Sequence, residues 1–285
     1  MAEVSACLGL CFFDHQLFYA VNNPSQEASL GRVGAVDFNF DVVEAVISAQ
    51  KKHLNGLRNS IDEVKQRFDI DQVRLLLNPT MECWTALPRL VYDDAEEREA
   101  HINILMNGLE RTRIHPAWHA LSNENFKLLQ LRTDHSLEGV QRLTSGISKV
   151  DYVSEFEIGE NWINHTRPGG SFLTVCCFKN CISVSSFILG KLRGATYINF
   201  DHPENLPYLW LQRAQELSWM QGLHEQIQVY GQQAFHIIEI LQPFWDDDGT
   251  VIKMDTLKKM QVSADEDTYG FDLELVYPAI MLALN

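Results

Sequence analysis

A repeated segment constrains the fold of this 285-residue chain more than any other feature of its sequence. The segment 34–41 (GAVDFNFD) aligns without a gap with the segment 194–201 (GATYINFD), an offset of 160 positions. Five of the eight positions are identical, including the first glycine and the last aspartate. Such a repeat is typical of two copies of one supersecondary unit, so it predicts two related halves.

The sequence around each copy predicts the same opening element. Short apolar runs alternate with polar turns containing Asn, Gly or Pro, which is the pattern of β-hairpins. Each half is therefore expected to begin with a three-stranded antiparallel meander. The predicted strands are 4–13, 17–21 and 33–38 in the first half, and 172–178, 182–189 and 195–200 in the second.

A helix and a short strand are expected after each meander. Apolar residues at three- and four-residue spacing predict helices over 43–68 and 205–225, and strands are predicted at 72–77 and 226–230. Asp41 precedes the first helix and is expected to cap it, and Asp201 or Asn205 is expected to cap the second.

The segment between the two copies does not repeat. Within it we expect a helix behind the acidic residues 93–97, a hairpin over 121–131 and a helix over 136–147. A strand at 151–158 is expected to close the first half before a linker at 167–170, and the closing elements of the second half are expected at 236–241 and 275–284. The predicted domains are 1–168, with a subdomain inserted at about 79–150, and 169–285.

This order of elements resembles the actin-like ATPase superfamily, whose members contain two ribonuclease-H-like domains. The segment 277–284 (YPAIMLAL) also looks like the proline-containing helix that closes PilM-like type IV pilus assembly proteins. The chain is similar in layout to uncharacterised bacterial actin-like proteins too. The resemblance implies an α/β protein with mixed sheets and a duplicated ribonuclease-H-like fold.

The sequence departs from that family where the nucleotide would bind. The resemblance implies an Asp-x-Gly turn in the first hairpin of each domain, but the first turn has Asp14 without a glycine, and the second has Lys179 and Asn180. In the adenosine segment, Gly270 is the one candidate. These four residues are the candidate nucleotide site and Asp14 is the candidate catalytic residue, while ATP with Mg²⁺ is the implied cofactor if nucleotide binding is retained.

Other clusters of polar residues are interpreted as structural. The acidic run 246–248 is expected to be a solvated turn, His115 and His119 lack a third metal ligand nearby, and Asp134 is expected to cap a helix rather than act with His135 and Ser136. No metal site is predicted. Cys7, Cys11, Cys176 and Cys177 lie in apolar runs and are expected to be buried and reduced.

The charge of the chain limits its partners. Lys and Arg number 23 against 38 Asp and Glu, a net charge of −15, and no basic run offsets it. Such a surface repels nucleic acid and anionic lipid, so protein partners are favoured. With no secretory signal and no long apolar span, a cytoplasmic location without membrane insertion is expected. Trp84, Tyr92 and Trp118 are candidates for a partner surface, although such residues more often lie in the core.

Two functional hypotheses follow. The first is a non-catalytic actin-like scaffold or adaptor for protein partners, in pilus or secretion assembly, that can form homo-oligomers and binds nucleotide weakly or not at all. The alternative is an active actin-like ATPase or a sugar-kinase-like phosphotransferase that uses Asp14.

Overall fold

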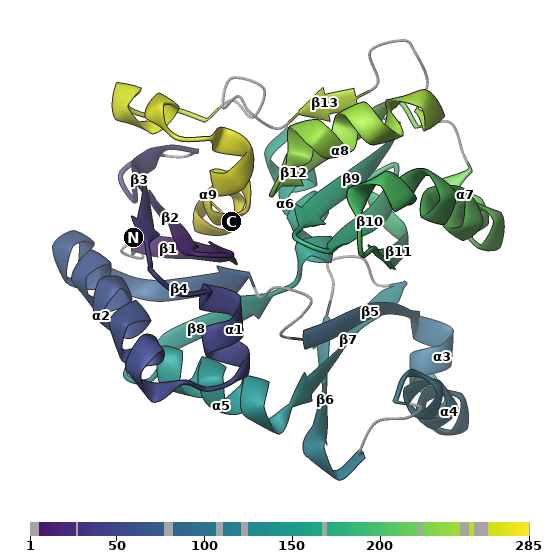
Figure 1. The fold of residues 1–285 in the computed structure, drawn as a ribbon, viewed down its shortest axis with the longest axis horizontal. Helices are drawn as coiled ribbons and strands as arrows, with labels where there is room; N and C mark the ends of the chain where they lie inside the picture. Colours follow the sequence, from purple (N-terminus) through teal and green to yellow (C-terminus); the bar gives the residue numbers. More distant parts are fainter. Residues whose placement is uncertain are drawn as a thin grey trace.

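The chain folds into three β-sheets with helices packed against them (Figure 1). The computed structural model describes residues 6–26, 28–76, 82–106, 111–120, 125–166, 170–221, 224–245, 251–253 and 262–284. Two of the sheets are mixed and the third is antiparallel, which confirms the predicted α/β class with mixed sheets.

The first sheet has the strand order β3-β2-β1-β4-β8. Its central strand β1 is buried along its whole length and pairs antiparallel with β2 and parallel with β4. A strand covered on both faces needs apolar residues at every position, and the sequence ACLGLCFF meets that requirement. The strands are β1 (Ala6–Phe13), β2 (Gln16–Asn22), β3 (Leu30–Asp37), β4 (Ile70–Leu76) and β8 (Lys149–Val153).

The second sheet repeats this arrangement, with the order β11-β10-β9-β12-β13. β9 pairs antiparallel with β10 and parallel with β12, as β1 does with β2 and β4. The repeated sequence lies at the end of the third strand of each sheet and in the residues that follow it. The strands are β9 (Ser171–Phe178), β10 (Cys181–Ile188), β11 (Lys191–Asn199), β12 (Gln226–Gly231) and β13 (Val251–Lys253).

Helices cover the outer face of each sheet. α1 (Val42–Ile47), α2 (Lys51–Phe68) and α5 (Asp134–Leu143) pack on the first sheet, and α7 (Leu206–Glu216) and α8 (Ala234–Leu241) pack on the second. The prediction of one helix over 43–68 was wrong. The helix is interrupted between α1 and α2, where Ala49 has a left-handed backbone conformation (φ 50°).

The inserted segment forms a sheet of its own, with the order β5-β7-β6, and packs Ile102 and Met106 of its helical side against Leu129 and Leu131. The expected hairpin is present, since β6 and β7 pair antiparallel, but it is longer than predicted: its first strand ends at Ala120, before the predicted range 121–131 begins, and its second starts at Phe126. The elements are β5 (Glu82–Pro88), α3 (Arg89–Asp93), α4 (Ala95–Leu105), a 3₁₀ turn (Arg111–Arg113), β6 (Ile114–Ala120) and β7 (Phe126–Thr133).

The segment 151–158 is not one strand. β8 ends at Val153, and α6 (Glu155–Thr166) starts directly after Ser154. The Ser154 N–H donates to Oε2 of Glu157 (2.7 Å) and its Oγ accepts from the N–H of Phe156 (3.1 Å). This reciprocal cap begins a helix where the alternation of apolar residues suggested a strand.

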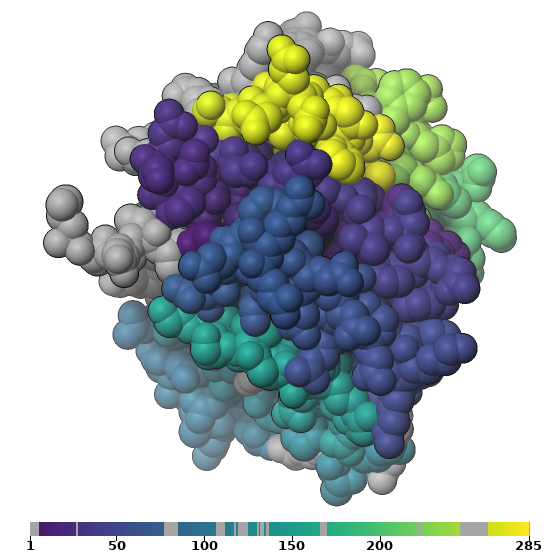
Figure 2. Space-filling model, turned by 90° about the vertical axis from the view of Figure 1, so that its left-hand side faces the viewer, coloured from purple at the N-terminus to yellow at the C-terminus, as the bar shows by residue number. Residues whose placement is uncertain are grey.

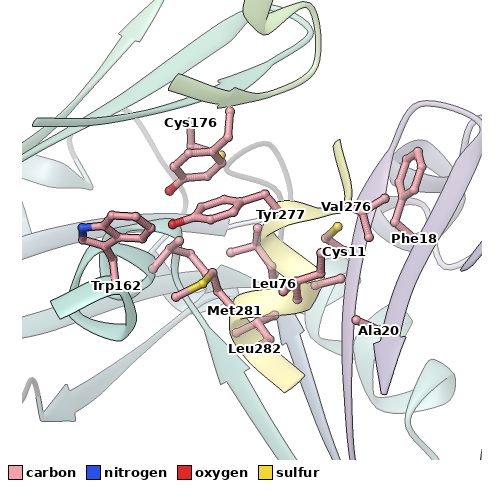
Figure 3. Close-up of a cluster of buried hydrophobic side chains, with 14 of the residues drawn as sticks. Cys11, Phe18, Ala20, Leu76, Trp162, Cys176, Val276, Tyr277, Met281 and Leu282 are labelled. Atoms are coloured by element: carbon pink, nitrogen blue, oxygen red, sulfur yellow. The ribbon is translucent and has the colours of Figure 1, made fainter. Parts of the chain in front are cut away.

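The C-terminal helix α9 (Leu273–Leu284) lies between the two sheets and contains Pro278. Figure 3 shows Tyr277 and Met281 on the side of Trp162 and Cys176, and Val276 on the side of Phe18. A Cβ added to Gly9 of β1 would lie 2.0 Å from the carbonyl oxygen of Ala279, so this glycine lets the helix backbone approach the strand. The cysteines Cys7, Cys11, Cys176, Cys177 and Cys181 are free and buried, as expected for those of them that the sequence singled out.

The segment before α9 also contacts the first sheet. Ser29 bridges to Ser263, and Arg32 pairs with Asp267 across 3.2 Å. Figure 2 shows this C-terminal part of the chain, in yellow, lying against the purple N-terminal strands. The strands of the first sheet all precede residue 154 and those of the second follow residue 170, while α9 ties both together. The domain boundary at 168 remains a prediction.

Candidate functional site

The first hairpin turn carries Asp14 between β1 and β2. Its backbone is left-handed (φ 46°), a conformation that Asp tolerates better than most residues. The Asp14 carbonyl accepts a hydrogen bond of 2.6 Å from the N–H of Val42, the first residue of α1. The turn and the helix start are therefore held together.

Lys179, in the turn between β9 and β10, reaches across to the first half. Its Nζ lies 3.6 Å from Oδ1 of Asp14 and 3.8 Å from Oδ2 of Asp41. Asp41 also caps α1, accepting from the N–H of Glu44 at 2.9 Å, as expected. Because Lys179 is largely exposed, each ion pair contributes at most about 1 kcal/mol. Together they join the β9–β10 turn to the β1–β2 turn and to the start of α1.

Gln232 completes this contact, although no motif in the sequence points to this residue. Its Nε2 donates to Oδ2 of Asp14, and its backbone N–H donates to the carbonyl of Cys177 (2.8 Å). The chain reaches this position through Gly231, which has a φ of 97° and sits where a Cβ would lie 2.3 Å from the Cys177 carbonyl oxygen. Asp14 is thus held by two side chains of the second half.

Aromatic rings fill the space behind the two turns. Phe13 and Phe178, the last residues of β1 and β9, are both buried, and their ring centroids lie 6.0 Å apart. The cavity that remains beside Lys179 has a volume of about 190 Å³ and is lined by the acids Asp14, Asp41 and Glu44. Small-molecule sites usually measure ~300–1,000 Å³. The residues present do not fit a triphosphate with Mg²⁺, since the cavity is small, acidic and already spanned by side chains.

A second and larger cavity, of about 550 Å³, shares Asn180 and Cys181 with the first. Asn199, Asp201, Asn205 and Tyr208 are among the residues that line it. The expected helix cap was wrong here: Asn205 is the N-cap residue of α7, but no side-chain hydrogen bond caps this helix or the 3₁₀ turn Pro203–Asn205 before it.

The structure does not bring Gly270 to either cavity. It lies in a 3₁₀ turn (Glu266–Gly270), and no atom beyond its chain neighbours lies within 4 Å of the position that a Cβ would take.

Of the candidate partner surface, Tyr92 and Trp118 are partly buried and touch edge to face, with ring centroids 4.9 Å apart. The Trp84 side chain lies outside the described residues.

The polar clusters weighed for metal binding give no such site in the described part of the chain. The acidic run 246–248 and the side chains of His119, His135 and Ser136 lie outside it. His115 contacts the carboxylate of Asp134, which is the first residue of α5.

Glu157 of α6 is a carboxylic acid whose pKa is shifted by the fold. Burial at the start of α6 raises its pKa from 4.5 to about 8, and the nearby carboxylates of Glu160, Glu155 and Asp151 add to the shift. The hydrogen bond from Ser154 opposes it only in part. The fold therefore favours the protonated form of this acid.

This shift predicts a pH dependence of stability. Because the folded state binds the Glu157 proton more tightly than the unfolded state, stability should fall as pH rises from 4.5 to about 8, by up to about 1.4 kcal/mol per pH unit. Glu157→Gln keeps an acceptor for Ser154 and should remove this component. Urea unfolding at about pH 5.5 and about pH 8.5 measures it. The control is Glu63→Gln, a substitution of an exposed residue of α2. If the free energy of unfolding depended on pH equally in both variants, Glu157 would not be the source of the pH dependence.

Comparison with known proteins adds the fold family. The chain matches no protein-family model and no curated protein. It is similar in structure to a chain of the PilM–PilN type IV pilus biogenesis complex, with a TM-score of 0.64 and 10% identity over 98% of this chain and 97% of that one. It is also similar to a protein of unknown function with an actin-like ATPase fold from Bacteroides thetaiotaomicron, with a TM-score of 0.58 and 11% identity over 98% and 96% of the two chains.

The chain has an actin-like ATPase fold. The similarity spans nearly the whole of each protein, so it includes both sheets and α9. Among the described helices, none is both long and apolar enough to cross a membrane.

Proposed function

We propose that this protein is a non-catalytic actin-like adaptor that holds protein partners, of the kind used in pilus or secretion assembly. The contact between the two hairpin turns carries the proposal. Lys179 and Gln232 of the second half hold Asp14 of the first. These are the turns at which the resemblance to actin-like ATPases implies phosphate binding. A carboxylate engaged in this way is not available to organise a metal-bound water.

Two further observations support protein partners. The net charge of −15 repels phosphates, so it disfavours nucleic acid as well as nucleotide. The similar fold from the PilM–PilN complex belongs to a protein that assembles with another protein. All the cysteines whose side chains the structure describes are free and buried, which is typical of a reducing compartment and supports a cytoplasmic location.

Calorimetric titration with Mg-ATP tests the proposal. We expect no heat of binding up to millimolar nucleotide and no release of phosphate, because the cavity at Lys179 is small and acidic. Micromolar binding accompanied by phosphate release would overturn the adaptor and favour the ATPase or phosphotransferase.

The variant Asp14→Ala separates these two functions if any phosphate release is detected. A catalytic Asp14 predicts that the variant folds normally and loses that release, whereas a contaminating activity would be unchanged. Asp71→Ala, at an exposed position of β4, is the matched control.

The neighbouring genes give a second test of the assembly role. Pilus or secretion genes beside this gene would support it, and a metabolic operon would count against it.

A further inference from the structure

The two aspartates that end the repeat are used differently. Asp41 caps α1 and lies 3.8 Å from Lys179, so its charge is compensated within the protein. Asp201, at the same position of the second copy, is exposed and caps neither α7 nor the 3₁₀ turn before it. Among the described residues, no Lys, Arg or His side chain forms a salt bridge with it.

The surroundings of Asp201 form a cavity of about 550 Å³, large enough for an amino-acid side chain with part of its backbone. Tyr208, which lines this cavity, is 71% exposed, and Leu209 adds an apolar residue to the lining. Asn180, Asn199 and Asn205 supply amide groups that both donate and accept hydrogen bonds. The cavity therefore combines one carboxylate, one open aromatic ring and several neutral acceptors.

The chemistry of this lining selects a cation over an anion. The start of α7 would favour an anion, but Pro207 removes one N–H there and the Asp201 carboxylate adds a negative charge to the cavity. An arginine suits it better than a lysine, because a planar guanidinium can pair with a carboxylate, stack on a tyrosine and donate its remaining N–H groups to amide oxygens.

We propose that this cavity binds an arginine side chain of a protein partner, paired with Asp201 and stacked on Tyr208. The partner being a protein rests on the proposed adaptor function. The overall negative charge of the chain adds a long-range attraction for a basic segment.

The test uses the full chain and the capped tripeptide acetyl-Gly-Arg-Gly-amide as the probe, followed by ¹H–¹⁵N NMR. We expect shifts of backbone amides within 199–209. Asp201→Asn should weaken binding at least about tenfold, since it removes a charge-assisted pair. Tyr208→Ala should weaken it about two- to fivefold through loss of stacking. Asp71→Asn changes the net charge equally, lies on the first sheet and should leave binding unchanged.

Two results would overturn the inference: unaltered binding by Asp201→Asn, or equal binding of acetyl-Gly-Glu-Gly-amide. The Mg-ATP titration separates this inference from the proposed function. If the chain turns over ATP yet binds the arginine peptide through Asp201, the adaptor proposal fails and the cavity assignment stands. If neither ligand binds, the cavity assignment alone fails.

Discussion

Gly9→Ala is expected to destabilise the protein by about 3 kcal/mol or more, at the upper end of what overpacking costs in a core. The new Cβ would lie 2.0 Å from the carbonyl oxygen of Ala279 and 2.7 Å from the backbone nitrogen of Ala283. Both are backbone atoms of α9, so no side chain can rotate away to relieve the overlap. The helix must move off β1, and its apolar contacts with the first sheet loosen with it.

Gly56→Ala is the matched control for this substitution. Gly56 lies in α2 with no other atom within 4 Å of the added Cβ, and alanine is the better helix former. This variant should gain up to about 1 kcal/mol. Urea unfolding of both variants measures the contrast, and a Gly9→Ala protein as stable as the unmodified chain would show that α9 does not pack against β1 in this way.

The meanders could be predicted from the sequence because their signals are local. Strand β1 is apolar throughout and is followed by a polar turn at Asp14, and β9 is likewise apolar and followed by Lys179 and Asn180. Hairpin register depends on the turn between neighbouring strands, so nothing distant in the chain has to be known.

The errors arose where the pattern of apolar residues permits two structures. Apolar spacing continues from α1 into α2, so the break at Ala49 has no signal in periodicity. The segment 151–158 alternates like a strand, yet the capping residues Ser154 and Glu157 start a helix inside it. Over so few residues, alternation does not distinguish a strand end from a helix start.

The candidate site was predictable only in part. Asp14 and Lys179 were identified from their turns, but contact between them joins residues far apart in the chain, and Gln232 has no motif at all. The repeat wrongly predicted a side-chain cap by Asp201 or Asn205. In the first copy the helix begins at Val42, directly after Asp41, whereas in the second a 3₁₀ turn separates Asp201 from α7. A short difference in the connection thus changes the role of the same residue.

Tyr277→Ala is expected to lower the free energy of unfolding by about 3–5 kcal/mol, the usual cost of truncating a buried aromatic residue. Tyr277 is 1% exposed, and its ring lies 4.7 Å from that of Tyr230 at the end of β12. It therefore fixes α9, which packs on the first sheet, to the second sheet (Figure 3).

The position of Tyr277 also predicts how the protein unfolds. Since α9 contributes to the core shared by both sheets, the unmodified chain should unfold in one transition, and the Tyr277→Ala variant should show a second transition as the sheets uncouple. Tyr269→Ala, which removes a ring that is 48% exposed just before α9, should change stability by no more than about 0.5 kcal/mol. Differential scanning calorimetry distinguishes these outcomes. A single transition with a loss no larger than that of Tyr269→Ala would mean that the two sheets are held together without the ring of Tyr277.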